Sequence, residues 1–129
     1  MLRLKDPQLT LWDALLPTDV IELNPELARV DELLDNDRFM APFISRFEAR
    51  LGRPTIPMET YLRMMYLKHR YGMGYEVLAQ EVNDSIKWRR FCRIPLTQKV
   101  PHATTLIKLT KRCGPGVVKE LNAALVQEA

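Results

Sequence analysis

Apolar residues recur at intervals of three and four along most of this 129-residue chain, and prolines and glycines interrupt the pattern at roughly helix-length intervals. Such spacing places apolar side chains on one face of an α-helix. No alternating strand pattern, internal repeat or low-complexity segment competes with it. The sequence therefore predicts an all-α, multi-helical fold. With 47% apolar residues, a chain of this length buries one core, so we expect a single domain.

The first half of the chain predicts four helices. Asp6-Pro7 and Asn24-Pro25 each offer a cap residue followed by proline at the first helical position. A third helix carries apolar residues up to Leu51 and is expected to stop at Gly52. The fourth begins at Pro57 and ends near Tyr71-Gly72. One face of this fourth helix is predicted to carry Met58, Tyr61, Leu62, Met65 and His69.

The second half predicts three short helices and a final one. Their apolar positions run from Tyr75 to Val82, from Trp88 to Cys92, from Leu106 to Cys113 and from Val117 to Leu125. A loop from Leu96 to Val100 separates the second from the third. This loop is longer than the turn of a tight helix-turn-helix unit, so any such unit here is expected to be a looser variant.

Charge is sorted along the chain. The net charge is −4 over residues 1–50, +8 over 51–113 and −1 over 114–129, for a total of +3. Between Ser85 and Cys113 no acidic residue occurs, while eight basic ones do: Lys87, Arg89, Arg90, Arg93, Lys99, Lys108, Lys111 and Arg112. Such a tract attracts a polyanion. The alternative is an ordinary solvated face, but those faces usually interleave Glu with Lys at i, i+4, and this one does not.

Other kinds of site find little support. Cys92 and Cys113, with His102 between them, match no common zinc spacing, and we interpret both thiols as small buried apolar groups in a reducing compartment. Nothing resembles a signal peptide or a membrane span, which predicts a cytoplasmic protein.

Asp31-Glu32 and Asp35-Asp37 fall on an amphipathic helix and its end, where solvated or capping roles are expected. No nucleophile and base pair, glycine-rich phosphate loop or metal-ligand cluster occurs. We therefore expect a non-enzymatic chain with no cofactor, no metal and no small-molecule substrate.

The three short helices have the organisation of a helix-turn-helix unit. In the last of them, Leu106, Leu109 and Cys113 lie opposite a face with Thr104, Lys108, Lys111 and Arg112. Its first turn places His102, Thr104 and Thr105 where small side chains approach base edges or phosphates. The alternative for the two threonines is N-terminal capping of that helix.

Trp88 and Phe91 are expected to anchor the preceding short helix in the core, with Arg89, Arg90 and Arg93 on its outer side. Stacking of these two rings on single-stranded or RNA bases is the alternative. A preference for single strands over duplex DNA distinguishes the two.

Several short motifs follow one another in a characteristic order. They are Gly52-Arg53-Pro54, Pro57, Tyr71-Gly72, Tyr75-Glu76-Val77-Leu78, Asp84, Trp88-Arg89-Arg90-Phe91-Cys92 and Pro101-His102-Ala103-Thr104-Thr105-Leu106. This set resembles the N-terminal domain of bacterial insertion-sequence transposases of the InsH-like, Asp-Asp-Glu class, over roughly Leu11 to Gly114. Lys108-Leu109-Thr110 departs from the Arg-Phe-Arg usual in that family, so no specific role is carried over to this turn.

The resemblance implies a function. Such a domain precedes an RNase H-like catalytic domain whose metal site cuts and rejoins DNA, and the expected carboxylates would lie beyond this chain, which we interpret as a fragment or truncated product. We expect double-stranded DNA binding at the terminal inverted repeats of a mobile element, in a nucleoid-associated protein for which a second copy of the chain is a possible partner. The alternative is a helical protein-interaction or oligomerisation module with a basic surface.

Three parts are expected within the single domain of residues 1–129. Residues 1–56 form scaffold and possible dimerisation helices, and 57–113 form the basic, helix-turn-helix-like part. Residues 114–129 form a C-terminal helix that leads to the absent catalytic domain.

Overall fold

The computed structural model describes residues 23–51 and 56–128, and every regular element within them is an α-helix. These helices are α3 (Pro25–Leu34), α4 (Asp37–Leu51), α5 (Met58–Tyr71), α6 (Tyr75–Asp84), α7 (Ile86–Phe91), α8 (Ala103–Cys113) and α9 (Pro115–Glu128). The all-α prediction is confirmed. The helix expected after Asp6-Pro7 and the stop at Gly52 lie outside the described residues. None of the described helices is long and apolar enough to cross a membrane.

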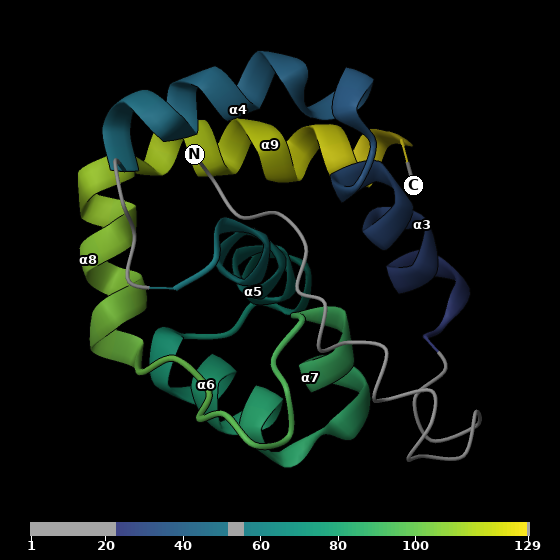
Figure 1. Ribbon diagram of the computed structural model, residues 1–129, viewed down its shortest axis with the longest axis vertical. Helices are drawn as coiled ribbons and strands as arrows, with labels where there is room; N and C mark the ends of the chain where they lie inside the picture. The colour runs from purple at the N-terminus through teal and green to yellow at the C-terminus, as the bar shows by residue number, and fades with distance from the viewer. Residues whose placement is uncertain (1–22, 52–55, 129) are drawn as a thin grey trace.

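Helix α5 lies at the centre of the molecule. Figure 1 shows it end-on, encircled by α3, α4 with α9, α8, α6 and α7. Met58, Tyr61, Leu62 and Met65 are buried as predicted, but burial is not confined to their face: every residue from Met58 to Leu67 is buried, because neighbours cover the helix on all sides. His69 was expected on that face and is exposed, because the last turn of α5 emerges from the ring of helices. The helix ends at Gly72 in the left-handed conformation, with φ of 63°.

One hydrophobic cluster runs through the described residues, from Leu27 on α3 to Leu125 on α9. Phe91 is buried in it as predicted, and Trp88 is half-buried against it, with its ring centroid 5.2 Å from that of Tyr71. Cys92 and Cys113 are both buried free thiols, which confirms their interpretation as apolar core residues. Burial raises the pKa of both thiols.

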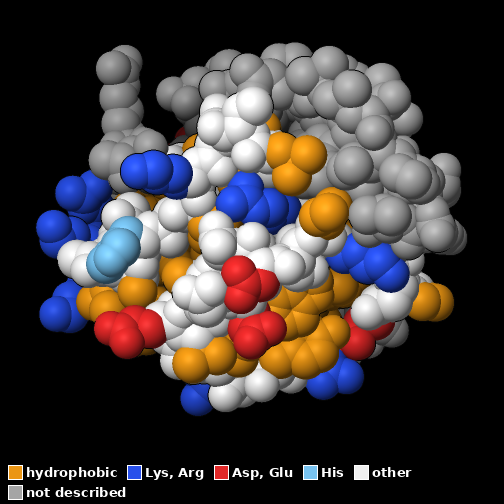
Figure 2. Space-filling view, turned by 90° about the horizontal axis from the view of Figure 1, so that it is seen from below, with side chains coloured by type: hydrophobic (Ala, Val, Ile, Leu, Met, Phe, Trp, Pro, Cys, Tyr) orange, Lys and Arg blue, Asp and Glu red, His pale blue; other side chains and the backbone are white. Residues whose placement is uncertain are grey.

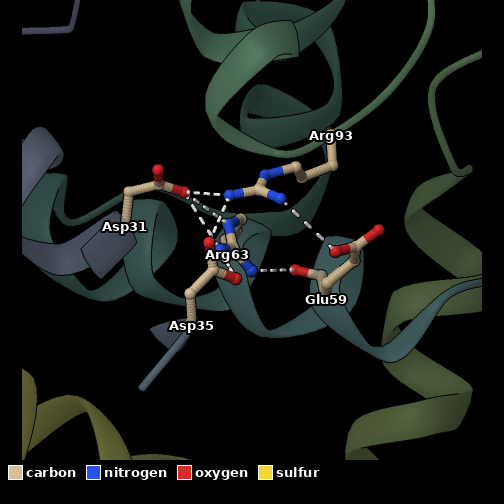
Figure 3. Close-up of polar contacts among 5 residues, drawn as sticks. All are labelled: Asp31, Asp35, Glu59, Arg63 and Arg93. Atoms are coloured by element: carbon tan, nitrogen blue, oxygen red, sulfur yellow. Dashed lines mark hydrogen bonds and ion pairs between the residues drawn. The ribbon is translucent and has the colours of Figure 1, made fainter. Parts of the chain in front are cut away.

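Inside this core, two arginines share two aspartates (Figure 3). The Arg63 side chain on α5 is only 1% exposed, and its Nη2 donates to Asp31 at 3.0 Å and to Asp35 at 3.2 Å. Arg93 Nη2 donates to the same two carboxylates, at 2.9 and 2.7 Å. The Arg93 Nη1 atom also lies 3.8 Å from the Glu59 carboxylate. The cluster joins α3, α5 and the residues that follow α7.

This cluster overturns two expectations from the sequence. Asp31 and Asp35 were expected to be solvated or to cap a helix, and instead they neutralise buried guanidinium groups. Arg93 was expected on the outer side of α7 with Arg89 and Arg90. Its side chain is instead 13% exposed and turned into the core. An arginine removed from water needs such carboxylate partners, because burying an unpaired charge costs several kcal/mol.

The backbone at Arg93 explains how its side chain reaches the core. The N–H of Arg93 donates to the Arg90 carbonyl at 3.0 Å, and that of Ile94 donates to the Arg89 carbonyl at 2.9 Å. This pair of bonds is the Schellman closure of a helix C-terminus, which requires a left-handed residue and usually selects glycine. Arg93 adopts φ of 62° instead. The conformation costs an L-residue roughly 1 to 2 kcal/mol, and two charge-assisted hydrogen bonds offset that cost.

The cluster predicts an unequal response to loss of an arginine. Arg63→Ala empties a fully buried site and leaves two partly exposed carboxylates with Arg93 as their remaining arginine, so it is expected to lower the free energy of unfolding by about 3 to 5 kcal/mol. The matched control is Arg29→Ala, because the Arg29 and Glu32 pair is 50% and 71% exposed and contributes about 0 to 1 kcal/mol. Urea unfolding followed by circular dichroism measures both. Equal, small losses would contradict a structural role for the cluster.

Candidate nucleic-acid interface

Helix α8 has one buried face and one solvent face. Ala103, Leu106, Leu109 and Cys113 are buried, and the helix packs against α4, α6 and α9. The exposed residues are Thr104, Lys108, Lys111 and Arg112, with Thr105 half-buried beside them. The two faces predicted from spacing are confirmed. No acidic residue occurs in α8, so its solvent face offers only hydroxyls and cations.

The start of α8 is capped by a residue that the sequence did not identify as a cap. His102 Nδ1 accepts from the Thr104 N–H at 3.2 Å, and the His102 carbonyl accepts from the Thr105 N–H at 3.0 Å. The alternative in which the threonines cap the helix is therefore wrong, because both lie within its first turn. The Thr104 side chain is exposed. Its Oγ1 atom lies 3.1 Å from Nδ1 of the His102 imidazole.

A hollow of about 310 Å³ lies between side chains of α6 and the residues that lead into α8. It is lined by Glu76, Ala79, Gln80, Asn83, Val100, Pro101, His102 and Ala103. The sequence did not identify these α6 side chains as site residues, because only the packing of α6 against α8 brings them to His102. The chain between α7 and α8 runs from Cys92 to His102, which agrees with a connection longer than a tight turn.

The other residues predicted to contact DNA differ in exposure and in the partners that they bind. Lys87 and Lys99 are exposed, and Arg90 is half-buried. Arg89 fastens the loop after α7: it donates to the Gln98 carbonyl at 3.0 Å and to Asn83 Oδ1 at 3.0 Å. Arg93 belongs to the core cluster. The structure thus brings His102, Thr104, Lys108, Lys111 and Arg112 together along α8, and it does not bring Arg93 to them.

Figure 2 shows how charge is distributed on the side of the molecule that carries α6 and α7. Lys and Arg side chains gather on the left, beside the histidine, and the left is the side on which α8 lies in Figure 1. One acidic side chain lies just below the histidine, others lie nearer the middle of this face, and hydrophobic ones are exposed toward the bottom. The described residues include no group of three or more His, Cys, Asp or Glu side chains that could hold a metal ion.

Comparison with known proteins gives one positive result. The family described as Transposase domain (DUF772) matches residues 15–112, about three quarters of the chain. No curated protein matches the chain, and neither does any solved structure.

The cap at His102 makes a testable prediction. His102→Ala removes the acceptor for the Thr104 N–H and is expected to lower the free energy of unfolding by about 1 kcal/mol. His102→Asn supplies another acceptor at the cap position, so it is expected to cost a few tenths of a kcal/mol at most. Urea unfolding curves compare the two variants with the unaltered chain. If alanine and asparagine behave alike, the imidazole does not cap α8.

Proposed function

Because this chain belongs to the Transposase domain (DUF772) family, we propose that it is the DNA-binding part of an InsH-like insertion-sequence transposase. In this proposal it recognises the terminal inverted repeats of a mobile element. The observation that carries the proposal is the solvent face of α8, which presents a hydroxyl and three cations with no acidic residue in the helix. Such a face fits the major groove of duplex DNA.

The proposed roles follow from position on α8. Lys111 and Arg112, in the last turn, contact backbone phosphates, which hold the helix in register but carry no sequence information. Thr104 and Lys108, which lie one turn apart, approach base edges. Helix α6 packs against both α7 and α8, and this supports a loose helix-turn-helix arrangement. Lys87 and Lys99 add outlying phosphate contacts.

The remaining assignments follow from the resemblance to the InsH-like, Asp-Asp-Glu class. Residues 57–113 supply the DNA-binding part, with residues 1–56 as scaffold and possible dimer surface and 114–129 leading toward the catalytic part. Cutting and joining of DNA belong to a separate Asp-Asp-Glu domain, so the role proposed for this chain is binding.

A second candidate function is a helical protein-interaction module. The observation that favours it is an exposed apolar surface, since Tyr71 is 40% exposed, Val77 53% and Ile86 37%. Association through apolar side chains depends little on counterions, whereas binding to phosphates depends on them steeply. A salt titration therefore separates the two functions.

DNA binding is predicted to weaken steeply with salt. If about four of the exposed cations meet phosphates, log K falls with log salt at a slope of about −3 to −4, since each phosphate contact contributes about −0.9. Fluorescence anisotropy of a labelled duplex, titrated at several salt concentrations, gives the slope. Absence of binding at low salt, or a flat dependence, contradicts the proposed function.

Loss of a base contact and loss of a phosphate contact are predicted to change the affinity for DNA in different ways. A preferred duplex is first selected from random sequences with the unaltered chain. Lys108→Ala then costs roughly 1 to 3 kcal/mol on that duplex and much less on random DNA. Lys111→Ala, the matched control on the same helix, weakens both duplexes alike and makes the salt slope shallower by about 0.9. A uniform loss for both variants would show that Lys108 does not read bases.

A further inference from the structure

Helices α4 and α8 end at the same corner of the molecule, and each caps the other (Figure 1). Arg50, in the last turn of α4, donates from Nη1 to the Cys113 carbonyl at 2.9 Å. Arg112, in the last turn of α8, donates from Nη1 to the Leu51 carbonyl at 3.2 Å. Both carbonyls belong to the final residue of their helix, where no helical N–H is available. The two guanidinium groups are thus held at one place by reciprocal bonds.

The Arg50 guanidinium lies close to Gly114, the residue that joins α8 to α9. A Cβ added to Gly114 would lie 2.9 Å from Arg50 Nη1, so the end of the arginine side chain would have to shift. Gly114 also adopts φ of 90°, a conformation that L-residues rarely adopt. Glycine at this position therefore serves both the turn into α9 and the approach of the arginine.

The capping bonds use only part of each guanidinium. The group carries several N–H donors in one plane, and a single hydrogen bond occupies each arginine here. Both residues are exposed, and neither forms an ion pair with any described residue. Arg63 and Arg93 differ, because carboxylates surround them in the core.

The electrostatics of the corner favour an anion. Each helix C-terminus contributes about −0.5 elementary charge, so the two termini together offset about one of the two arginine charges. The acidic residues nearest to the two arginines in the sequence do not offset the second arginine charge. Glu48 stands two positions from Arg50, a spacing that does not share a helix face, and Glu120 is paired with Arg46 at 2.6 Å.

We propose that Arg50 and Arg112 together clamp one backbone phosphate of duplex DNA at the C-terminal end of α8. This inference rests on the proposed function, and it extends the DNA-binding surface from α8 to α4. It assigns a DNA contact to a residue in the acidic half of the chain. Paired guanidinium groups suit this role, since each matches phosphate geometry with two parallel N–H donors. The capping bonds fix their orientation before DNA arrives, which lowers the entropy lost on binding.

The test compares two charge-removing substitutions on the same helix. Arg50→Gln removes one of the two cations that neutralise the clamped phosphate, so it is expected to make the salt slope shallower by up to about 0.9, the full contribution of one phosphate. Arg38→Gln is the control, because Arg38 is exposed at the other end of α4, about 18 Å along the axis and beyond the screening length in ordinary salt. It is expected to leave the slope unchanged. Circular dichroism establishes that each variant is folded.

Three outcomes are decisive. A steep slope for the unaltered chain, made shallower by Arg50→Gln alone, supports the clamp. A steep slope that neither variant changes overturns the clamp and leaves the proposed function standing. No DNA binding by the unaltered chain removes both.

A second measurement needs no variant and so does not depend on the folding of Arg50→Gln. Phenylglyoxal modification of the unaltered chain, mapped by mass spectrometry, is expected to slow at Arg50 and Arg112 when duplex is added and to continue at Arg38. Unchanged modification of Arg50 with saturating duplex would overturn the clamp.

Discussion

The fold depends on a shared ion-pair cluster, in which Arg63 and Arg93 each bind both Asp31 and Asp35. Burying an unpaired arginine would cost several kcal/mol, and the two partly exposed aspartates offset that cost by pairing with both guanidinium groups. The cluster fixes α3 against α5, and it also fixes the residue at which α7 ends. Helix α7 packs on α6, and α6 in turn packs on α8, so the cluster is connected through α6 to the helix that carries the solvent face.

The same cluster divides the basic residues into two groups. Arg93 neutralises core carboxylates and Arg89 holds a loop, so neither has its whole guanidinium available to a polyanion. The lysines of α8 remain exposed. Local sequence could not make this division, because Asp31 lies 62 positions from Arg93. The tract from Ser85 to Cys113 lacks acids in sequence, while folding supplies them from α3.

Predictions that rest on local chemistry agree with the structure. Asn24 accepts from the Leu27 N–H at 2.8 Å ahead of Pro25, and Gly72 ends α5, because caps act within one turn of a helix. Predictions that depend on contacts between segments distant in the sequence do not agree with the structure. The burial of α5 on all sides depends on a ring of helices distant in sequence. The sequence did not predict Arg50 as a DNA contact, because it lies in an acidic segment and only the packing of α4 on α8 brings it to Arg112.

The account holds that the exposed face of α8 meets DNA while the arginines of the core cluster do not. Nitrogen-15 NMR of the chain with added duplex tests this most directly, because backbone and arginine side-chain signals report on both groups at once. We predict that the signals of Thr104, Lys108, Lys111 and Arg112 shift and that the side-chain signals of Arg63 and Arg93 stay in place. Shifts centred on the core cluster or α3, with α8 unchanged, would contradict the account.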